Sequence, residues 1–212
     1  MHSVAWMATV FVLLAAPLAD AQRRTARKPA PSPPVKEPAK VKCPELLGTG
    51  LKTRATYCFV LAGRDPAEGV IISVPPHTGT ATLTFDLHNR HTYSEEEVRA
   101  GRGFATYTSV VAVLGMDGTL IGRGAVQSEV RTARDLYDRI TGGAGPGGVK
   151  AVAPLGREQV TITIPADVTE VSLLGEVLEG MTAAGRQVAS PGRPVALVSS
   201  VQVEYRPAPS KR

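Results

Sequence analysis

The sequence predicts a mainly β fold: a two-sheet β-sandwich or jelly roll with one or two short helices, spanning residues 43–206. Three observations predict it. β-Branched and apolar residues occur in short runs that Gly, Pro, Asp and Asn separate. Residues 80–88 alternate strictly between apolar and polar, as in a strand with one buried face. The sequence Met116-Asp117-Gly118 between two apolar runs indicates a tight hairpin turn, since Asp-Gly supplies the positive φ angles of that turn.

In chain order, the first segment is a predicted signal peptide, residues 1–21. An apolar run from Val4 to Leu18 is followed by Ala19-Asp20-Ala21, a small-residue cleavage signal. A membrane span needs about 20 apolar residues, and this run ends sooner. We therefore expect cleavage and no transmembrane span in the mature protein. A retained N-terminal anchor is the alternative, because the segment before the run lacks Lys and Arg.

Residues 22–42 form a predicted disordered linker that is basic and rich in proline. The linker holds seven Lys or Arg against Glu37 alone, whereas residues 43–212 hold 17 charges of each sign. Its prolines predict an extended spacer that forms neither helix nor sheet ladder. Such a segment is attracted to an anionic envelope surface or an acidic glycan, and a solvated spacer is the alternative. The neutral remainder of the chain predicts no specific binding of nucleic acid.

Two cysteines, Cys43 and Cys58, predict a structural disulfide, because a lone pair in an oxidising compartment is most simply paired. Neither a C-x-x-C motif nor further ligands accompany them, which argues against a redox or zinc site. The signal peptide and the disulfide together predict a periplasmic or secreted protein. The sequence predicts no cofactor.

The domain itself is expected to contain eight strands and two short helices. Ser94 and Glu97 form a predicted capping box, and Gly101 ends that helix. Residues 132–140 show the same pattern and predict the second helix. Both helices are too short to be regular βαβ crossovers. The predicted strands are residues 56–62, 69–74, 80–88, 104–114, 119–130, 159–164, 170–178 and 195–205.

Two glycine- or proline-containing segments are expected to be irregular. The run Gly143-Ala144-Gly145-Pro146-Gly147-Gly148 matches G-x-G-x-x-G, but it does not connect a strand to a helix, so it indicates a mobile surface loop. Residues 207–212 are expected to form a disordered tail.

The densest group of chemically versatile side chains lies around Asp86, His88 and His91. Asp86 and His88 share a strand face, and His91 follows in what the pattern suggests is a turn. These three residues are the candidate ligands of a divalent metal, which would indicate a metal-dependent hydrolase. The simpler interpretation is a solvated strand end without bound metal.

The mature chain is poor in aromatic residues, because the single tryptophan, Trp6, belongs to the signal peptide. Tyr93 and Tyr107 are therefore the candidate ligand-contact residues. No G-x-S-x-G or H-E-x-x-H motif is present. The sequence thus favours an exported, non-catalytic binding or structural accessory module of the bacterial envelope, with the metal-dependent hydrolase as the alternative.

Overall fold

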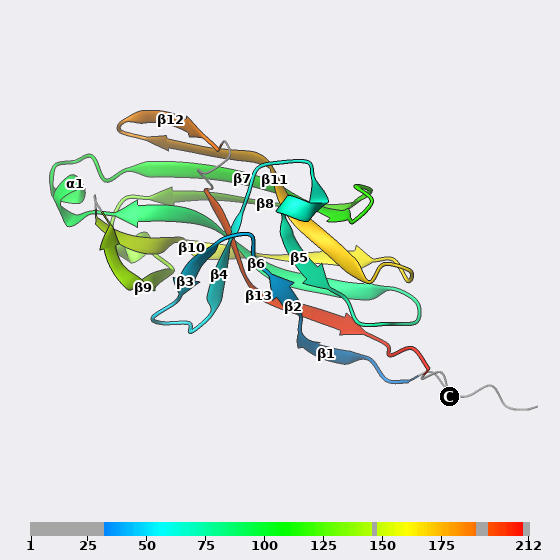
Figure 1. Ribbon diagram of the computed structural model, residues 1–212. Helices are drawn as coiled ribbons and strands as arrows, with labels where there is room; N and C mark the ends of the chain where they lie inside the picture. Colours follow the sequence, from blue (N-terminus) through cyan, green and yellow to red (C-terminus); the bar gives the residue numbers. More distant parts are fainter. Residues whose placement is uncertain (1–31, 146–147, 190–194, 210–212) are drawn as a thin grey trace, which may run out of the picture. The chain divides into compact units, whose positions relative to one another are not determined.

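The computed structural model describes residues 32–145, 148–189 and 195–209 (Figure 1). In this part of the chain, strands form two antiparallel sheets, accompanied by one short α-helix and two 3₁₀ turns. The predicted mainly β fold and the β-sandwich are confirmed. No helix among these residues is long and apolar enough to cross a membrane. The predicted signal peptide, residues 1–21, and residues 22–31 of the predicted linker lie outside the described residues.

The first sheet has the strand order β3-β4-β13-β6-β10-β9, and β1 pairs with β13. β13 changes neighbours along its length, from β4 at residues 196–198 to β1 at residues 202–205. A register shift between Ser199 and Gln202 separates the two pairings, and Ser200 has a φ of 53° there. The strands of this sheet are β1 (Val35–Pro38), β3 (Leu46–Thr49), β4 (Thr56–Val60), β6 (Ala81–Tyr93), β9 (Asp138–Gly145), β10 (Gly148–Ile164) and β13 (Ala196–Tyr205).

The second sheet has the order β2-β5-β11-β7-β8, and β12 pairs with β11. The expected hairpin turn between β7 and β8 is confirmed: Gly118 has a φ of 84°, and its N–H donates to the Gly115 carbonyl at 2.9 Å. The strands are β2 (Lys40–Lys42), β5 (Val70–Ser73), β7 (Ala105–Gly115), β8 (Leu120–Val130), β11 (Glu170–Thr182) and β12 (Gly185–Val188). A 3₁₀ turn, η1 (Pro66–Glu68), precedes β5.

The main core lies between the two sheets, where the apolar face of β6 meets β7 and β11. Leu83, Phe85 and Leu87 are fully buried there. Burying a side chain of this size contributes about 1.5–3 kcal/mol. A smaller apolar cluster covers the opposite face of the first sheet and includes Tyr57 and Leu197. The first sheet is therefore covered on both faces over part of its area.

The expectation that the linker forms no ladder is wrong for residues 35–42. β1 pairs with β13 and β2 pairs with β5, so this segment adds one strand to each sheet. β1 lies at an edge, and Pro38 is its last residue. Proline has no N–H to donate to the ladder, and an edge strand tolerates the loss of that hydrogen bond.

The expected helix over residues 132–140 is only partly present. Thr132 and Asp135 do form a reciprocal capping box, but the 3₁₀ turn η2 (Ala133–Asp135) ends there and β9 begins at Asp138. Ile140 is buried in the smaller apolar cluster, and the glycines that follow it disfavour helix. The glycine run expected to be a loop instead continues β9 and begins β10, with Gly145 paired to Gly148. Residues 146 and 147 lie outside the described residues.

The expected helix after Ser94 is confirmed as α1 (Glu95–Arg99), which connects β6 of the first sheet to β7 of the second (Figure 1). The Ser94 side chain accepts from the Glu97 N–H at 3.4 Å, and Gly101 follows with a φ of 74°. Glu97 does not complete the capping box, because its carboxylate instead pairs with Arg102.

The predicted disulfide between Cys43 and Cys58 is confirmed. It joins the end of β2, a strand of the second sheet, to β4 of the first sheet. The expected tail is paired at its start, where Pro207 bridges His77 and the Ala208 N–H donates to the Pro76 carbonyl at 3.1 Å. Residues 210–212 lie outside the described residues.

Candidate functional site

β6 carries all three candidate metal ligands, and it continues to Tyr93 instead of ending at His88. Because successive residues of a strand point to opposite faces of its sheet, His88 and His91 lie on opposite faces. The structure therefore does not bring Asp86, His88 and His91 together. Among the residues that the structure describes, no group of three or more His, Cys, Asp or Glu side chains is placed to hold a metal ion.

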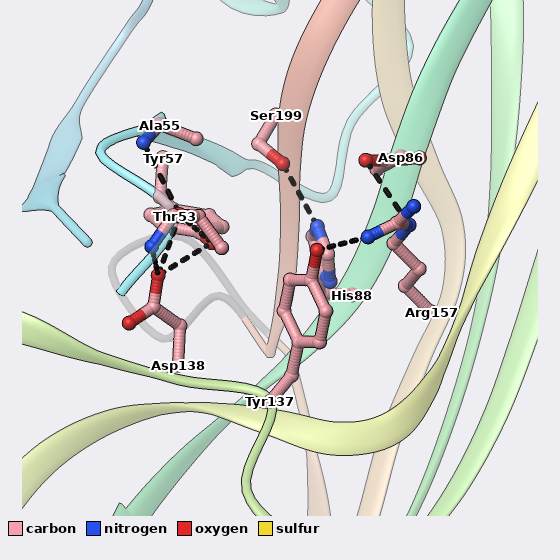
Figure 2. Close-up of polar contacts among 9 residues, drawn as sticks. All are labelled: Thr53, Ala55, Tyr57, Asp86, His88, Tyr137, Asp138, Arg157 and Ser199. Atoms are coloured by element: carbon pink, nitrogen blue, oxygen red, sulfur yellow. Dashed lines mark hydrogen bonds and ion pairs between the residues drawn. The ribbon is translucent and has the colours of Figure 1, made fainter. Parts of the chain in front are cut away.

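The expectation that Asp86 and His88 are solvated is wrong. Asp86 is 5% exposed and His88 is fully buried, because the smaller apolar cluster and β9 cover their face of the first sheet. Figure 2 shows the His88 ring beside that of Tyr137, with which it stacks at a centroid distance of 5.2 Å. The ring of Tyr57 meets His88 edge-on at 5.4 Å.

The polar atoms of this cluster are only partly satisfied. His88 Nε2 and Ser199 Oγ are hydrogen-bonded at 2.9 Å, and Arg157 Nε lies 3.4 Å from Asp86 Oδ2. Arg157 also donates to the hydroxyl of Tyr137 (Figure 2). Within the described part of the chain, Asp86 Oδ1 and His88 Nδ1 are buried without a hydrogen-bond partner.

The contact between His88 and Ser199 resembles a general base beside a nucleophile in its distance. However, Ser199 is 2% exposed, and no carboxylate contacts Nδ1 of His88 among the described residues. Burial, together with the charge of Arg157, lowers the pKa of His88 to about 4 against the opposing effect of Asp138. The imidazole is thus neutral and enclosed at neutral pH, and the cluster holds β4, β6 and β13 together.

Asp138, which the sequence analysis did not single out, anchors the turn that joins β3 to β4. It accepts from the N–H groups of Lys52 and Thr53, both at 3.0 Å, and from the Thr53 hydroxyl at 2.5 Å. The buried Tyr57 hydroxyl donates to the same carboxylate at 3.2 Å. Burial raises the pKa of Asp138, but these hydrogen bonds outweigh it and keep the carboxyl below its usual value.

The opposite, inter-sheet face of β6 leads into a cavity of about 420 Å³, which we call the end cavity. The cavity lies where α1 and the turn between β11 and β12 are found, at the left of Figure 1. Its volume is in the range of small-molecule sites, about 300–1,000 Å³. Lining side chains that can bind a polar ligand include His91, Tyr93, Glu97, Arg102, Tyr107, Thr182 and Gln187.

His91 and Tyr107 form the inner wall of the end cavity. His91 Nδ1 and the Tyr107 hydroxyl are hydrogen-bonded at 2.8 Å, and the rings meet edge-on. Burial lowers the pKa of His91 to about 4. Burial likewise raises the pKa of Tyr107 to about 12, against the opposing charge of Arg90. Both groups are therefore neutral at neutral pH, and they present hydrogen-bonding atoms without charge.

A polar layer between the sheets lies next to this wall. Asn89 Nδ2 donates to Ser109 Oγ at 2.5 Å, and Ser128 Oγ donates to Asn89 Oδ1 at 2.6 Å. These bonds join β6 of the first sheet to β7 and β8 of the second. The inter-sheet space thus changes from apolar at Leu87 to polar at Asn89 and His91, toward the end cavity.

The predicted ligand-contact residues, Tyr93 and Tyr107, both line the end cavity. They are only 4% and 8% exposed, so they form part of its wall and not a flat stacking surface. Gln187 of the lining could not be proposed from the sequence. The alternation of Leu87, Asn89, His91 and Tyr93 extends the strand past His88 and assigns Arg90 to the opposite face, where its guanidinium lies over the ring of Phe59.

Comparison with known proteins does not assign the chain to a family. No protein-family model matches the chain, and no curated protein matches it either. The function must therefore be argued from the site itself.

Proposed function

We propose that this protein is an exported, non-catalytic binding module of the bacterial envelope, and that the end cavity is its ligand site. The observation that carries the proposal is the meeting of His91, Tyr93 and Tyr107 on one cavity of small-molecule size. Convergent polar groups in a concave site between structural layers are typical of ligand binding. The disulfide supports the location outside the cytoplasm, since such bonds persist in oxidising compartments.

The arrangement of the site supports binding in preference to catalysis. His91 is the lining imidazole, and its Nδ1 is already bonded to the neutral hydroxyl of Tyr107. A general base works best with a pKa near the working pH, whereas burial holds the pKa of His91 at about 4. The pair is suited to fixing the shape of the cavity wall.

We also propose that residues 22–42 attach the module to an anionic envelope surface or an acidic glycan. Lys36, Lys40 and Lys42 support this, because all three are exposed on β1 and β2. Four further cations precede them in the sequence. Cations near an anionic surface each contribute about 1 kcal/mol of attraction.

A screen of the full-length chain by ligand-observed NMR tests the binding function. The compounds are small sugars, sugar acids, amino sugars and amino acids of the envelope. Ala184 is exposed in the turn between β11 and β12 and lines the end cavity, so Ala184→Trp should fill the cavity without disturbing the core. We expect at least one binder whose signal disappears with Ala184→Trp.

Ala67→Trp is the matched control, because Ala67 is also exposed but belongs to η1, outside the lining of the end cavity. Binding should survive this change. Binders that tolerate Ala184→Trp, or a screen without any binder, would contradict the proposal.

A further inference from the structure

The charged side chains that face the end cavity neutralise each other. Glu97 and Arg102 both line it. Arg102 donates to the Glu97 carboxylate through Nε at 2.9 Å and Nη2 at 2.8 Å, which makes a bidentate pair of opposite charges. The Arg102 N–H also donates to the Glu97 carbonyl at 2.8 Å, so the backbone holds the two residues together. The pair therefore adds no net charge to the cavity.

The guanidinium of Arg90 points away from the end cavity. Arg90 stands between Asn89 and His91 on β6, so it occupies the face of the strand opposite to theirs. There its guanidinium lies over the ring of Phe59 at 5.7 Å. Its N–H donates to the carbonyl of Val195 at 2.6 Å, which places its main chain at the cavity wall.

Two uncharged groups on opposite sides of the cavity remain free to bind a ligand. His91 Nδ1 is bonded to the Tyr107 hydroxyl, whereas Nε2 is accessible and has no partner among the described residues. The exposed side chain of Gln187 has no partner in that part of the chain either. Gln187 pairs with Gly180, where a Cβ atom would lie 3.0 Å from the Tyr107 ring. Because directly paired residues share a face of the sheet, Gln187 also faces inward.

Both free groups can donate or accept hydrogen bonds. The Tyr107 hydroxyl can donate to His91 Nδ1 or accept from it, so Nε2 can be a donor or an acceptor. The Gln187 amide has both kinds of atom. Hydroxyl groups likewise donate and accept, whereas a carboxylate only accepts and an ammonium only donates. Either ion would also lose its hydration in the cavity without an unpaired opposite charge to replace it.

We propose that the end cavity binds an uncharged, hydroxyl-rich small molecule, of which a neutral hexose is the simplest representative. His91 of the first sheet and Gln187 of the second bind its hydroxyl groups. The pair of Glu97 and Arg102 keeps the lining neutral, so a charged analogue finds no counter-charge. This inference rests on the proposed binding function and specifies its ligand class.

Three monosaccharides that differ in the charge of one substituent test the inference: glucose, glucuronate and glucosamine. Each is titrated into the full-length chain in mildly acidic buffer, where glucosamine carries an ammonium group. The dissociation constant is read from the NMR resonances of His91 and Gln187. We expect glucose to bind at least about fivefold more tightly than either charged sugar.

The two halves of the ion pair provide variants with opposite expectations. Arg102→Gln leaves the Glu97 carboxylate unpaired, so glucosamine should gain about threefold or more relative to glucose, and glucuronate should not. Glu97→Gln leaves the Arg102 guanidinium unpaired and should favour glucuronate in the same way. Arg123→Gln and Glu176→Gln are the matched controls, because they break a second bidentate pair outside the lining of the end cavity. Both should retain the wild-type order of affinities.

The outcomes separate this inference from the function on which it rests. A charged sugar that binds the wild type as tightly as glucose, with shifts at His91 and Gln187, would overturn the ligand class and leave the binding function intact. The same reordering of affinities in the control variants would overturn the role of the lining charges. If none of the three sugars shifts these resonances, the inference is wrong, and the wider screen decides the function. The comparison on the wild type tests the preference even if a variant does not fold.

Discussion

Two buried histidines, His88 and His91, occupy opposite faces of β6 and share one electrostatic property. Burial is the main cause that lowers the pKa of each to about 4, and at His88 the charges of Arg157 and Asp138 act in opposite directions. In the unfolded chain a histidine titrates near pH 6.5. Between these values the unfolded state binds protons that the native state does not, so acid favours unfolding. His88 and His91 thus make the stability of the fold depend on pH.

The first prediction concerns this pH dependence. The contribution of the neutral histidines to stability is complete above pH 6.5 and is lost as the pH falls toward 4. Each should cost about 2 kcal/mol of unfolding free energy between pH 7.5 and pH 5. Urea unfolding of the wild type at pH 7.5, 6.5, 5.5 and 5.0 measures the loss. The His88→Gln/His91→Gln variant should be less stable at pH 7.5 but show a flatter pH profile, and a profile parallel to that of the wild type would refute the assignment.

At the scale of single elements, residues 35–42 connect the two sheets. β1 pairs with residues 202–205 of β13 in the first sheet, and β2 then pairs with β5 in the second. Between them, the Ala39 N–H donates to the Val201 carbonyl at 3.0 Å. The disulfide at Cys43 follows directly. The exposed lysines of this segment are therefore held on the folded domain.

The second prediction follows from that placement. Lys36→Glu/Lys40→Glu/Lys42→Glu should weaken binding of the full-length chain to anionic phospholipid vesicles at least tenfold, at about 1 kcal/mol per cation. Sedimentation with vesicles in 50 mM salt gives the affinity, which should fall by physiological salt, where the Debye length is about 8 Å. Arg64→Glu/Arg99→Glu/Arg134→Glu, with the same change of net charge at exposed positions elsewhere, is the control. An equal loss in both variants would mean that net charge, and not this segment, determines binding.

The sequence predicted the strand centres better than the strand ends. Residues 80–88 alternate because one face of the strand packs in the inter-sheet core, and all of them but the first lie within β6. The same alternation continues with polar residues at Asn89 and His91, and there hydropathy alone no longer separates the two faces. Asp86 and His88 were taken for solvated residues because a local pattern cannot reveal Tyr57 and Tyr137, which come from other strands and turns. The end cavity depends on the same non-local packing, so among its residues only Tyr93 and Tyr107 could be proposed in advance as ligand contacts, and His91 was proposed as a metal ligand instead.

At the scale of the whole domain, the spacing of the two sheets is set along the edge where β8 meets β10. Gly122 and Gly124 of β8 face Ile162 and Val160 of β10. A Cβ atom on Gly124 would lie 2.7 Å from Val160 Cγ2, and one on Gly122 would lie 2.9 Å from Ile162 Cδ1. The sheets can approach this closely only because those side chains are absent. The neighbouring strands β6 and β7 carry His91 and Tyr107, so the same spacing supports the wall of the end cavity.

The last prediction tests this close approach with a double-mutant cycle. Gly124→Ala should destabilise the fold by about 1–3 kcal/mol, because the new methyl group overlaps Val160. The φ of Gly124 is not in the left-handed region, so the cost would arise from packing and not from backbone strain. Val160→Ala alone removes buried methyl groups and should also destabilise. In the double variant the smaller alanine at position 160 makes room for the one at position 124, so the total loss in urea unfolding free energy should be smaller than the sum of the single losses by about 1 kcal/mol or more. Additive losses would show that the sheets can separate at this edge without strain, and that their spacing is set elsewhere in the core.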